Sequence, residues 1–283
     1  MAVRGITIRL VAALAVVVLL ADCGNRKGVN ASRGVPLETF TAEQIYQRAE
    51  YDLENGDPDD AAELFGEIER LYPYSEWAKR ALIMQAFSYH QDHDYENSRA
   101  SAQRYIDFYP ADEDAAYAQY LLALSYYDQI DEVGRDQGLT YQALQALRTV
   151  IETYPDSEYA RSAILKFDLA FDHLAAKEME IGRFYLSGQH YTAAINRFRV
   201  VVEDFQTTTH TAEALHRLVE AYLSLGLVDE AQTAGAILAY NFQSTVWYQD
   251  SYQLLVKNGL QAQAKGDSWL RQVHRQMIKG QWL

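Results

Sequence analysis

The sequence has a single cysteine, Cys23, in 283 residues, so the chain can form no internal disulfide. Proline is scarce as well: there are five, and Pro36 and Pro58 precede or open segments with helical character. Since proline breaks the interior of a helix and is tolerated in its first turn, this scarcity favours an almost wholly helical protein. The sequence also lacks GxSxG, HExxH, CxxC, P-loop and dinucleotide-binding fingerprints. These absences argue against an enzyme and against a cofactor.

Basic residues are fewer than acidic residues. The first 22 residues contain Arg4, Arg9 and Asp22; removing them from totals of 25 basic and 39 acidic residues leaves 23 against 38, a net charge of −15. So acidic a protein is repelled by nucleic acid and by anionic lipid headgroups. The sequence therefore predicts no nucleic-acid partner, and any attachment to a membrane has to come from another source.

A short stretch of consecutive apolar residues lies near the N-terminus. Arg4 and Arg9 precede LVAALAVVVLLA, which is wholly apolar and covers residues 10–21. A spanning helix needs about 20 apolar residues, whereas roughly 7–15 behind a basic lead is typical of a signal peptide. We therefore predict a signal peptide at residues 1–22.

The residues that follow the leader resemble a bacterial lipobox. In LADCG, Cys23 occupies the lipidated position, and Asp22 stands where the pattern has a small residue. The resemblance implies acyl chains on Cys23 and, because Gly24 follows it, retention at the outer membrane. Residues 23–40 would then be the lipidated cysteine and a flexible tether. An ordinary secretory leader followed by a free thiol is the alternative.

A repeat begins after the tether. In AEYDLENGDPDDAAELFGEIERLYP (residues 49–73), small, turn and apolar residues fall at intervals of 7, 5, 4 and 8, at Ala49, Gly56, Ala61, Phe65 and Pro73. This is the spacing of a tetratricopeptide (TPR) repeat, a helix–turn–helix unit of about 34 residues. Alanines allow the two helices to cross closely, glycine ends the first helix, and proline stops the second.

The pattern recurs along the chain. LYPYSEWAKRA at 71–81 returns as FYPADEDAAYA at 108–118 and as TYPDSEYARSA at 153–163, which we interpret as the hinges between repeats. In the fourth unit we align Gly188 and Ala193 with Gly56 and Ala61, and Asp204-Phe205 with the Tyr-Pro pair. We predict five repeats near 42–75, 79–112, 116–157, 174–207 and 212–245, with one long helix over 157–188.

The predicted fold is an all-α superhelical solenoid with a C-terminal capping helix in WYQDSYQLLVKNGL. We divide it into N-terminal repeats at 41–157, C-terminal repeats with the cap at 158–265, and a tail at 266–283. We expect the tail to be frayed or bound to a partner, because its Trp and Leu side chains have little left to pack on.

Histidines and tyrosines are the remaining candidates for chemistry. His90 and His93 share a helix face beside Asp94, but they lie at a repeat turn where polar residues are ordinary, and a metal site needs three or four ligands. His210 and His216 are six residues apart and do not share a face well. We therefore predict no metal site. The many tyrosines are either repeat-core residues or the lining of a peptide groove, where aromatic rings supply rigid contact area.

The chain resembles the BamD family, the TPR lipoproteins of the outer-membrane β-barrel assembly (Bam) machinery. The resemblance covers nearly the whole chain and is most specific in ERLYPYSEWAKRA, in the inserted GRDQ of the third repeat, and in YTAAINRFRVVVEDF of the fourth. It implies an adaptor that aids the insertion of β-barrel proteins into the outer membrane and works beside other Bam lipoproteins, anchored on the periplasmic side by its acyl chains.

The resemblance also implies roles for individual residues. The N-terminal repeats would bind the C-terminal strand of an unfolded client, with Tyr72 at a position implicated in this contact. The C-terminal repeats would dock on the periplasmic domains of the barrel subunit, BamA, through Arg197, with Arg135 and Asp136 of the insertion as further docking residues. For Arg197 the alternative is an intrahelical pair with Glu203 or another nearby acid.

Two other classes stay open. A TPR envelope lipoprotein of cell-wall or division complexes carries similar hinges, although it typically has an N-terminal coiled coil, and residues 24–40 show no heptads. A lipid-anchored enzyme is the third class, disfavoured by the missing motifs.

Overall fold

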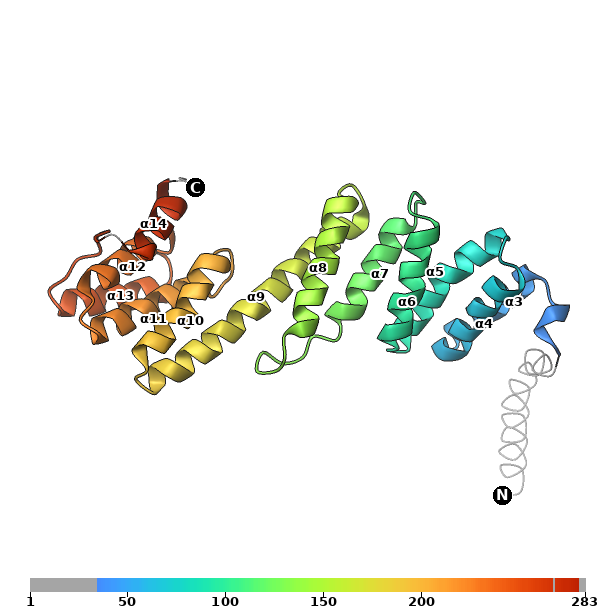
Figure 1. Cartoon of the computed structure of the whole chain (residues 1–283), viewed down its shortest axis with the longest axis horizontal. Helices are drawn as coiled ribbons and strands as arrows, with labels where there is room; N and C mark the ends of the chain where they lie inside the picture. The colour runs from blue at the N-terminus through green and yellow to red at the C-terminus, as the bar shows by residue number, and fades with distance from the viewer. Residues whose placement is uncertain (1–34, 267, 280–283) are drawn as a thin grey trace, which may run out of the picture. The chain divides into compact units, whose positions relative to one another are not determined.

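The structure is a computed structural model that describes residues 35–266 and 268–279. Within these residues every regular element is a helix: twelve α-helices, labelled α3 to α14, and a short 3-10 helix, η2 (Leu37–Thr39) (Figure 1). None of the described helices combines the length and apolarity needed to cross a bilayer. The predicted signal peptide, Cys23 and most of the predicted tether lie outside the described residues.

The helices follow one another in pairs, which confirms the all-α repeat fold. The five pairs are α3 (Ala42–Glu54) with α4 (Pro58–Leu71), α5 (Glu76–Gln91) with α6 (Tyr95–Phe108), α7 (Ala115–Tyr127) with α8 (Gly138–Thr153), α9 (Glu158–Ser187) with α10 (Tyr191–Asp204), and α11 (Thr211–Ser224) with α12 (Val228–Asn241). Two single helices follow, α13 (Val246–Lys257) and α14 (Trp269–Lys279).

The chain forms two compact units, divided within α5 between Met84 and Gln85. In the first unit, Ala49 on α3 and Ala61 on α4 are fully buried, as is Phe65. The ring of Tyr46 meets Phe65 edge-on, with 5.2 Å between ring centroids. The small residues predicted for a close helix crossing therefore lie in the core of this unit.

The second unit is organised along α9, a single helix of 30 residues, as predicted (Figure 1). At 1.5 Å per residue it is about 45 Å long, and it packs against both α8 and α10. The contact with α10 requires Gly182, because a Cβ there would lie 2.4 Å from the ring of Phe198, which is fully buried.

The sequence that recurs at 71–81, 108–118 and 153–163 forms the connection between repeats. The second helix of each pair ends at an aromatic residue with nearly the same backbone angles: Tyr72, Tyr109, Tyr154, Phe205 and Phe242. In four of these connections the third residue after the aromatic donates its hydroxyl to the aromatic residue's carbonyl at 2.7–2.8 Å: Ser75, Ser157, Thr208 and Thr245. The Ser157 oxygen also accepts the amide of Ala160 and so caps the next helix. The recurring sequence therefore has a structural role, as its repetition predicts.

The alignment of the fourth repeat was wrong by one residue. Its turn places Gln189, with φ 62°, where the fifth repeat has Gly226 with φ 73°, whereas Gly188 has φ −81°. Ala194 rather than Ala193 is accordingly the fully buried alanine of α10, and Phe205 occupies the hinge position of Tyr72. The alignment was wrong because it placed Gly188 at the left-handed position, which Gln189 occupies in this repeat.

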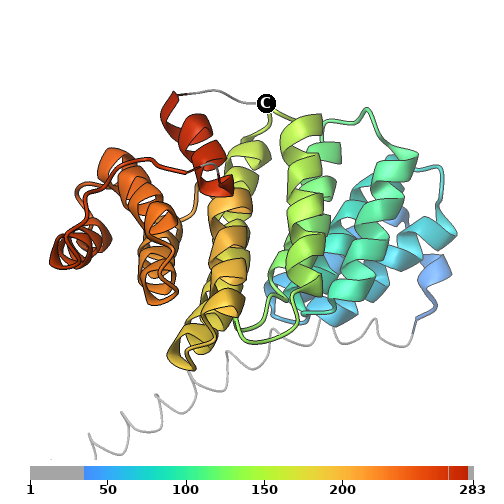
Figure 2. The same cartoon turned by 60° about the vertical axis from the view of Figure 1, so that its left-hand side comes forward.

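The C-terminal end is more ordered than predicted. Helix α13 packs on α11 and α12, which agrees with the predicted cap. The expectation that the tail has little to pack on is wrong over residues 269–279, because α14 packs on α12 (red in Figure 2) and Leu270 and Val273 are buried. The Trp269 Nε1 donates to the Tyr222 hydroxyl at 3.0 Å, and the Arg199 guanidinium lies 4.9 Å from the centre of the Trp269 ring.

Candidate functional site

Tyr72, the predicted client-binding residue, is half-buried in the first unit. Its hydroxyl donates a hydrogen bond to the carbonyl of Phe40, and its ring packs against the core of that unit. The phenol therefore joins the end of α4 to the segment before α3. The neighbouring Tyr74, by contrast, is fully exposed.

The insertion of the third repeat is the loop 128–137, and its inner side is attached to α9. His173 lies with Nδ1 3.1 Å from the Gln137 side-chain oxygen, and Lys177 donates to the Gly134 carbonyl at 2.6 Å. Asp136 accepts the amide of Gly138 at 2.8 Å, where α8 begins. Arg135 points outward: its side chain is 70% exposed and lies 3.6 Å from Asp131. Of the two predicted docking residues, Arg135 is the accessible one and Asp136 shapes the loop.

Arg197 forms an ion pair, but with a different partner from the one considered in the sequence. Its Nη1 lies 3.1 and 3.4 Å from the two carboxylate oxygens of Glu178, so the pair joins α10 to α9. Glu203 pairs with Arg199 at 2.8 Å. Both contacts of Arg197 are made by Nη1, and the side chain remains 42% exposed. A partner carboxylate can therefore reach the outer side of this guanidinium.

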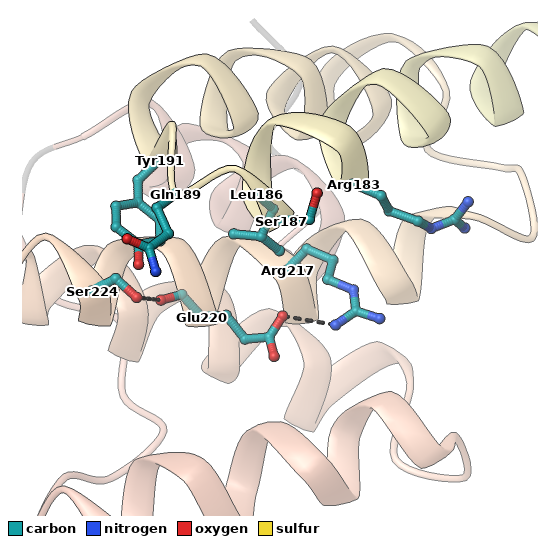
Figure 3. A pocket seen from close by; sticks show the side chains of 8 residues that line it. All are labelled: Arg183, Leu186, Ser187, Gln189, Tyr191, Arg217, Glu220 and Ser224. Carbon is teal, nitrogen blue, oxygen red and sulfur yellow. Dashed lines mark hydrogen bonds and ion pairs between the residues drawn. The ribbon is translucent and has the colours of Figure 1, made fainter.

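An open hollow of about 510 Å³ lies between the end of α9, the start of α10 and α11 (Figure 3). Seven of its eight lining residues carry a polar or charged group: Arg183, Leu186, Ser187, Gln189, Tyr191, Arg217, Glu220 and Ser224. Two arginines and a glutamate thus face a space that a side chain or an extended segment of a partner can enter.

A line of charges connects the hollow to the core. Arg183 on α9 holds Glu213 on α11 with two parallel hydrogen bonds, Nε to Oε1 at 2.9 Å and Nη2 to Oε2 at 2.6 Å. Arg217 bridges Glu213 at 3.3 Å and Glu220 at 2.8 Å. The buried His216 continues the line, with Nε2 3.6 Å from Glu220 and Nδ1 2.8 Å from the Ser251 hydroxyl on α13. This network fixes the arginines that border the hollow.

The network keeps both glutamates ionised. Burial raises the pKa of Glu213, but the hydrogen bonds and charges of Arg183 and Arg217 outweigh burial, so its pKa lies below the ordinary value. The pKa of Glu220 is lowered in the same way, against burial, by His216 and Arg217. The hollow is thus bordered by fixed charges of both signs, which suits a partner with charged and polar groups.

The other histidines have separate neighbours. His90 Nε2 lies 3.1 Å from Asp128, and burial lowers the pKa of this imidazole. His93 has φ 63° and its Nδ1 lies 2.9 Å from the Tyr95 hydroxyl. In the part of the chain that the structure describes, no three His, Cys, Asp or Glu side chains gather as metal ligands do.

Comparison with known proteins identifies the family. The model of the YfiO family, described as outer membrane lipoproteins, matches residues 38–237. The chain is 44% identical to the outer membrane protein assembly factor BamD of Caulobacter vibrioides, over 87% of this chain and 81% of that protein. It belongs to the BamD family of outer membrane lipoproteins.

Other members of the BamD family are similar over a comparable length. Identity is 41% to BamD of Rickettsia prowazekii, over 88% of this chain and 97% of that protein, and 25% to BamD of Neisseria meningitidis serogroup A, over 83% and 91%. Among solved structures, the TPR domain of P58(IPK) aligns with 77% of this chain and 56% of the P58(IPK) chain, at 18% identity and a TM-score of 0.28. This similarity is too weak to bear on the fold.

The charged hollow of this BamD-family chain could not be predicted from the sequence. Glu213, Arg217 and Glu220 are spaced three and four apart on one helix, a pattern that predicts mutual ion pairs. Arg183 is 30 residues from Glu213, however, and no local spacing reveals that pair. Exposed apolar side chains of α9 were also missed: Leu165, Leu169 and Phe184 are 64%, 62% and 73% exposed.

Proposed function

We propose that this protein is an outer membrane protein assembly factor that acts as a lipid-anchored periplasmic adaptor. The observation that carries the proposal is its similarity to the BamD assembly factors of Caulobacter vibrioides and Rickettsia prowazekii, which extends over most of both chains. A stack of helical hairpins supports an adaptor, because such repeats offer extended surfaces for binding proteins. We infer a non-catalytic role.

The second unit provides the surface that docks on the barrel subunit, BamA. Arg197 supports this, since its guanidinium is held in place by Glu178 and remains partly exposed. Exposed Leu165 and Leu169 on α9 add apolar area, and Arg135 adds a second exposed cation. Arginine is enriched among the residues that dominate binding energy, and the fully buried core of an interface is more apolar than the rest of the surface.

The N-terminal repeats at 41–157 bind the C-terminal strand of an unfolded β-barrel client. The wholly exposed Tyr74 beside Tyr72 supports an aromatic contact at the first hinge. The Tyr72 hydroxyl already donates a hydrogen bond to the Phe40 carbonyl, so it is not free for a client. Tyr72 therefore contributes to client binding through the edge of its ring and by fixing the hinge.

Purification of the tagged protein from detergent-solubilised membranes tests the proposed function. We expect a large β-barrel subunit and further lipoproteins to co-purify in fixed ratio. Recovery of cell-wall or division proteins in place of a barrel subunit overturns the proposal in favour of an envelope adaptor of another complex. Turnover of a substrate by the purified protein overturns the non-catalytic role.

A further inference from the structure

Helix α9 is about twice as long as the first helices of the neighbouring repeats, so its two halves have different neighbours (Figure 1). It has 30 residues, whereas α7 has 13 and α11 has 14. The first half packs on α7 and α8, and the second half packs on α10 and is joined to α11 by the pair of Arg183 and Glu213. The next repeat therefore follows the second half of α9 and not the first.

The side of a first helix that meets the next repeat can be located by counting from the hinge aromatic residue that precedes it. The eleventh residue after the hinge is Tyr120 in α7, and its ring lies 5.6 Å from the ring of Tyr159 on α9. In α11 it is His216, which is buried, with its ring 5.5 Å from that of Trp247 on α13. The fifteenth residue lies on the same side, since residues four apart share a helix face. Where another repeat follows directly, its first helix covers this side.

In the first half of α9 the same two positions hold leucines that are not covered. Counted from Tyr154, they are Leu165 and Leu169, which are 64% and 62% exposed. Helix α13, which no further repeat follows, has Gln253 and Lys257 at these positions, and both are exposed. Polar residues are what the end of a repeat stack requires. Adjacent exposed leucines at an uncovered position are instead typical of an interaction site.

A hollow of about 220 Å³ adjoins Leu169, between α9 and the loop that follows α7. Four of its six lining residues are apolar or aromatic: Tyr127, Ile130, Asp131, Leu169, Ala170 and His173. Ile164, which is 45% exposed, extends the apolar area along α9. Arg161 and Asp168 border this area, are exposed, and form no ion pair with another described residue. An apolar centre with unpaired charges around it has the anatomy of a protein interface.

We propose that the first half of α9 binds an amphipathic helix of a partner protein, in the place that the first helix of the next repeat takes on α7 and α11. A large apolar side chain of this helix fills the hollow beside Leu169, and its charged residues pair with Arg161 and Asp168. A helix is favoured over an extended segment because helices cover the equivalent positions of α7 and α11, and because a helix satisfies its own backbone hydrogen bonds on an apolar face. The inference rests on the proposed adaptor function and specifies what the docked partner presents.

Site-specific photocrosslinking of the full-length protein in whole cells tests the proposal. The photoreactive residue p-benzoylphenylalanine replaces Arg161 or Leu169, which are about 12 Å apart along α9 at 1.5 Å per residue, and mass spectrometry maps the captured residues. We expect both sites to capture one partner, at residues about eight apart, as in a helix that lies along α9. An extended strand, which rises about 3.3 Å per residue, gives a spacing of about four. Strand spacing, capture of a second copy of this chain, or no capture overturns the proposal.

A double variant measures what the two leucines contribute. Leu165→Gln with Leu169→Gln should lower recovery of the partner from detergent-solubilised membranes at least tenfold, because burial of a leucine side chain contributes strongly to binding. The matched control, Leu225→Gln with Leu227→Gln, changes two exposed leucines at the turn between α11 and α12 and should keep wild-type recovery. Circular dichroism should show the same helicity in both. Equal losses in the two double variants, or no loss in the α9 variant, overturn the proposal.

Failure of this inference can be distinguished from failure of the adaptor function. If a barrel subunit co-purifies with the wild type but residues 161 and 169 capture nothing, the adaptor function stands and the inference is overturned. If both residues capture a protein of another envelope complex at helical spacing, the inference is supported and the function in β-barrel assembly is overturned. Support comes from the spacing of the captured residues and not from capture alone.

Discussion

The docking role proposed for Arg197 has to be distinguished from its internal ion pair. Arg197 holds Glu178 while remaining partly exposed, so Arg197→Glu would also set two carboxylates against each other across α9 and α10. We therefore predict the effects of a neutral pair of variants. Arg197→Gln should weaken binding to the periplasmic domains of the barrel subunit about tenfold or more, as expected when one partner of an interfacial charge pair is lost. Isothermal titration calorimetry measures this.

A substitution of Glu178, the ion-pair partner of Arg197, is the matched control. Glu178→Gln breaks the same internal pair but leaves the guanidinium free, and it should bind the barrel subunit at least as well as the wild type does. Circular dichroism at 222 nm should show unchanged helicity in both variants. If Glu178→Gln weakens docking as much as Arg197→Gln, the role of Arg197 is internal.

The stability of the second unit should depend on pH through Glu213. Its pKa is lowered in the folded state, so its contribution is fully present above the unfolded pKa of about 4.3 and is lost as pH falls through the folded pKa. At pH 7 we expect Glu213→Gln to lower the free energy of unfolding by about 1–3 kcal/mol, because Arg183 loses a charged acceptor. Between about pH 5 and pH 3 the wild-type and Glu213→Gln values should converge.

Denaturant titrations at a series of pH values measure that convergence. Glu132→Gln, which removes one carboxylate from the exposed third-repeat loop, is the matched control. A Glu213→Gln curve that runs parallel to the wild type down to pH 3 would contradict the assignment of the lowered pKa to the Arg183 and Arg217 contacts.

At the scale of helices, the contact between α9 and α10 depends on one missing side chain. A Cβ at residue 182 would lie 2.4 Å from Phe198, so Gly182→Ala has to separate the two helices or displace the ring. Overpacking of this kind costs about 1–3 kcal/mol, against a gain of roughly 1 kcal/mol in helix propensity. We expect net destabilisation in urea. Gly134→Ala, whose Cβ would have its nearest neighbour at 3.9 Å, should be nearly neutral; equal effects would contradict the packing argument.

The helix pairs could be predicted because their signals are local. The hinge phrase combines an aromatic residue that ends one helix with a hydroxyl that caps the next, and all of this lies within a few residues, as at Tyr154 and Ser157. The left-handed turn of the fourth repeat was misplaced because Gln189 adopts it without the usual glycine. The packing of α14 and the pairs of Arg183 and Arg197 were missed, since their partners are distant in the sequence.

At the scale of the whole chain, the described residues combine helical repeats with charged side chains that are held in place by ion pairs. In the second unit, Arg183, Glu213 and Arg217 pair with one another, and this fixes the arginines that border the hollow. Attachment to the membrane is predicted at Cys23, which lies outside these described repeats.

The covalent attachment predicted at Cys23 can be separated from charged contacts with other membrane-bound subunits by its salt dependence. Two or three acyl chains hold a protein on a membrane at about 0.8 kcal/mol per buried methylene, independent of ionic strength, whereas contacts between exposed charges are screened by salt. We predict that Cys23→Ala moves most of the protein from the membrane to the soluble fraction. Protein that stays on the membrane through charged contacts should be released by about 0.5 M salt. Membrane retention of Cys23→Ala that survives high salt would contradict anchoring by acyl chains on Cys23.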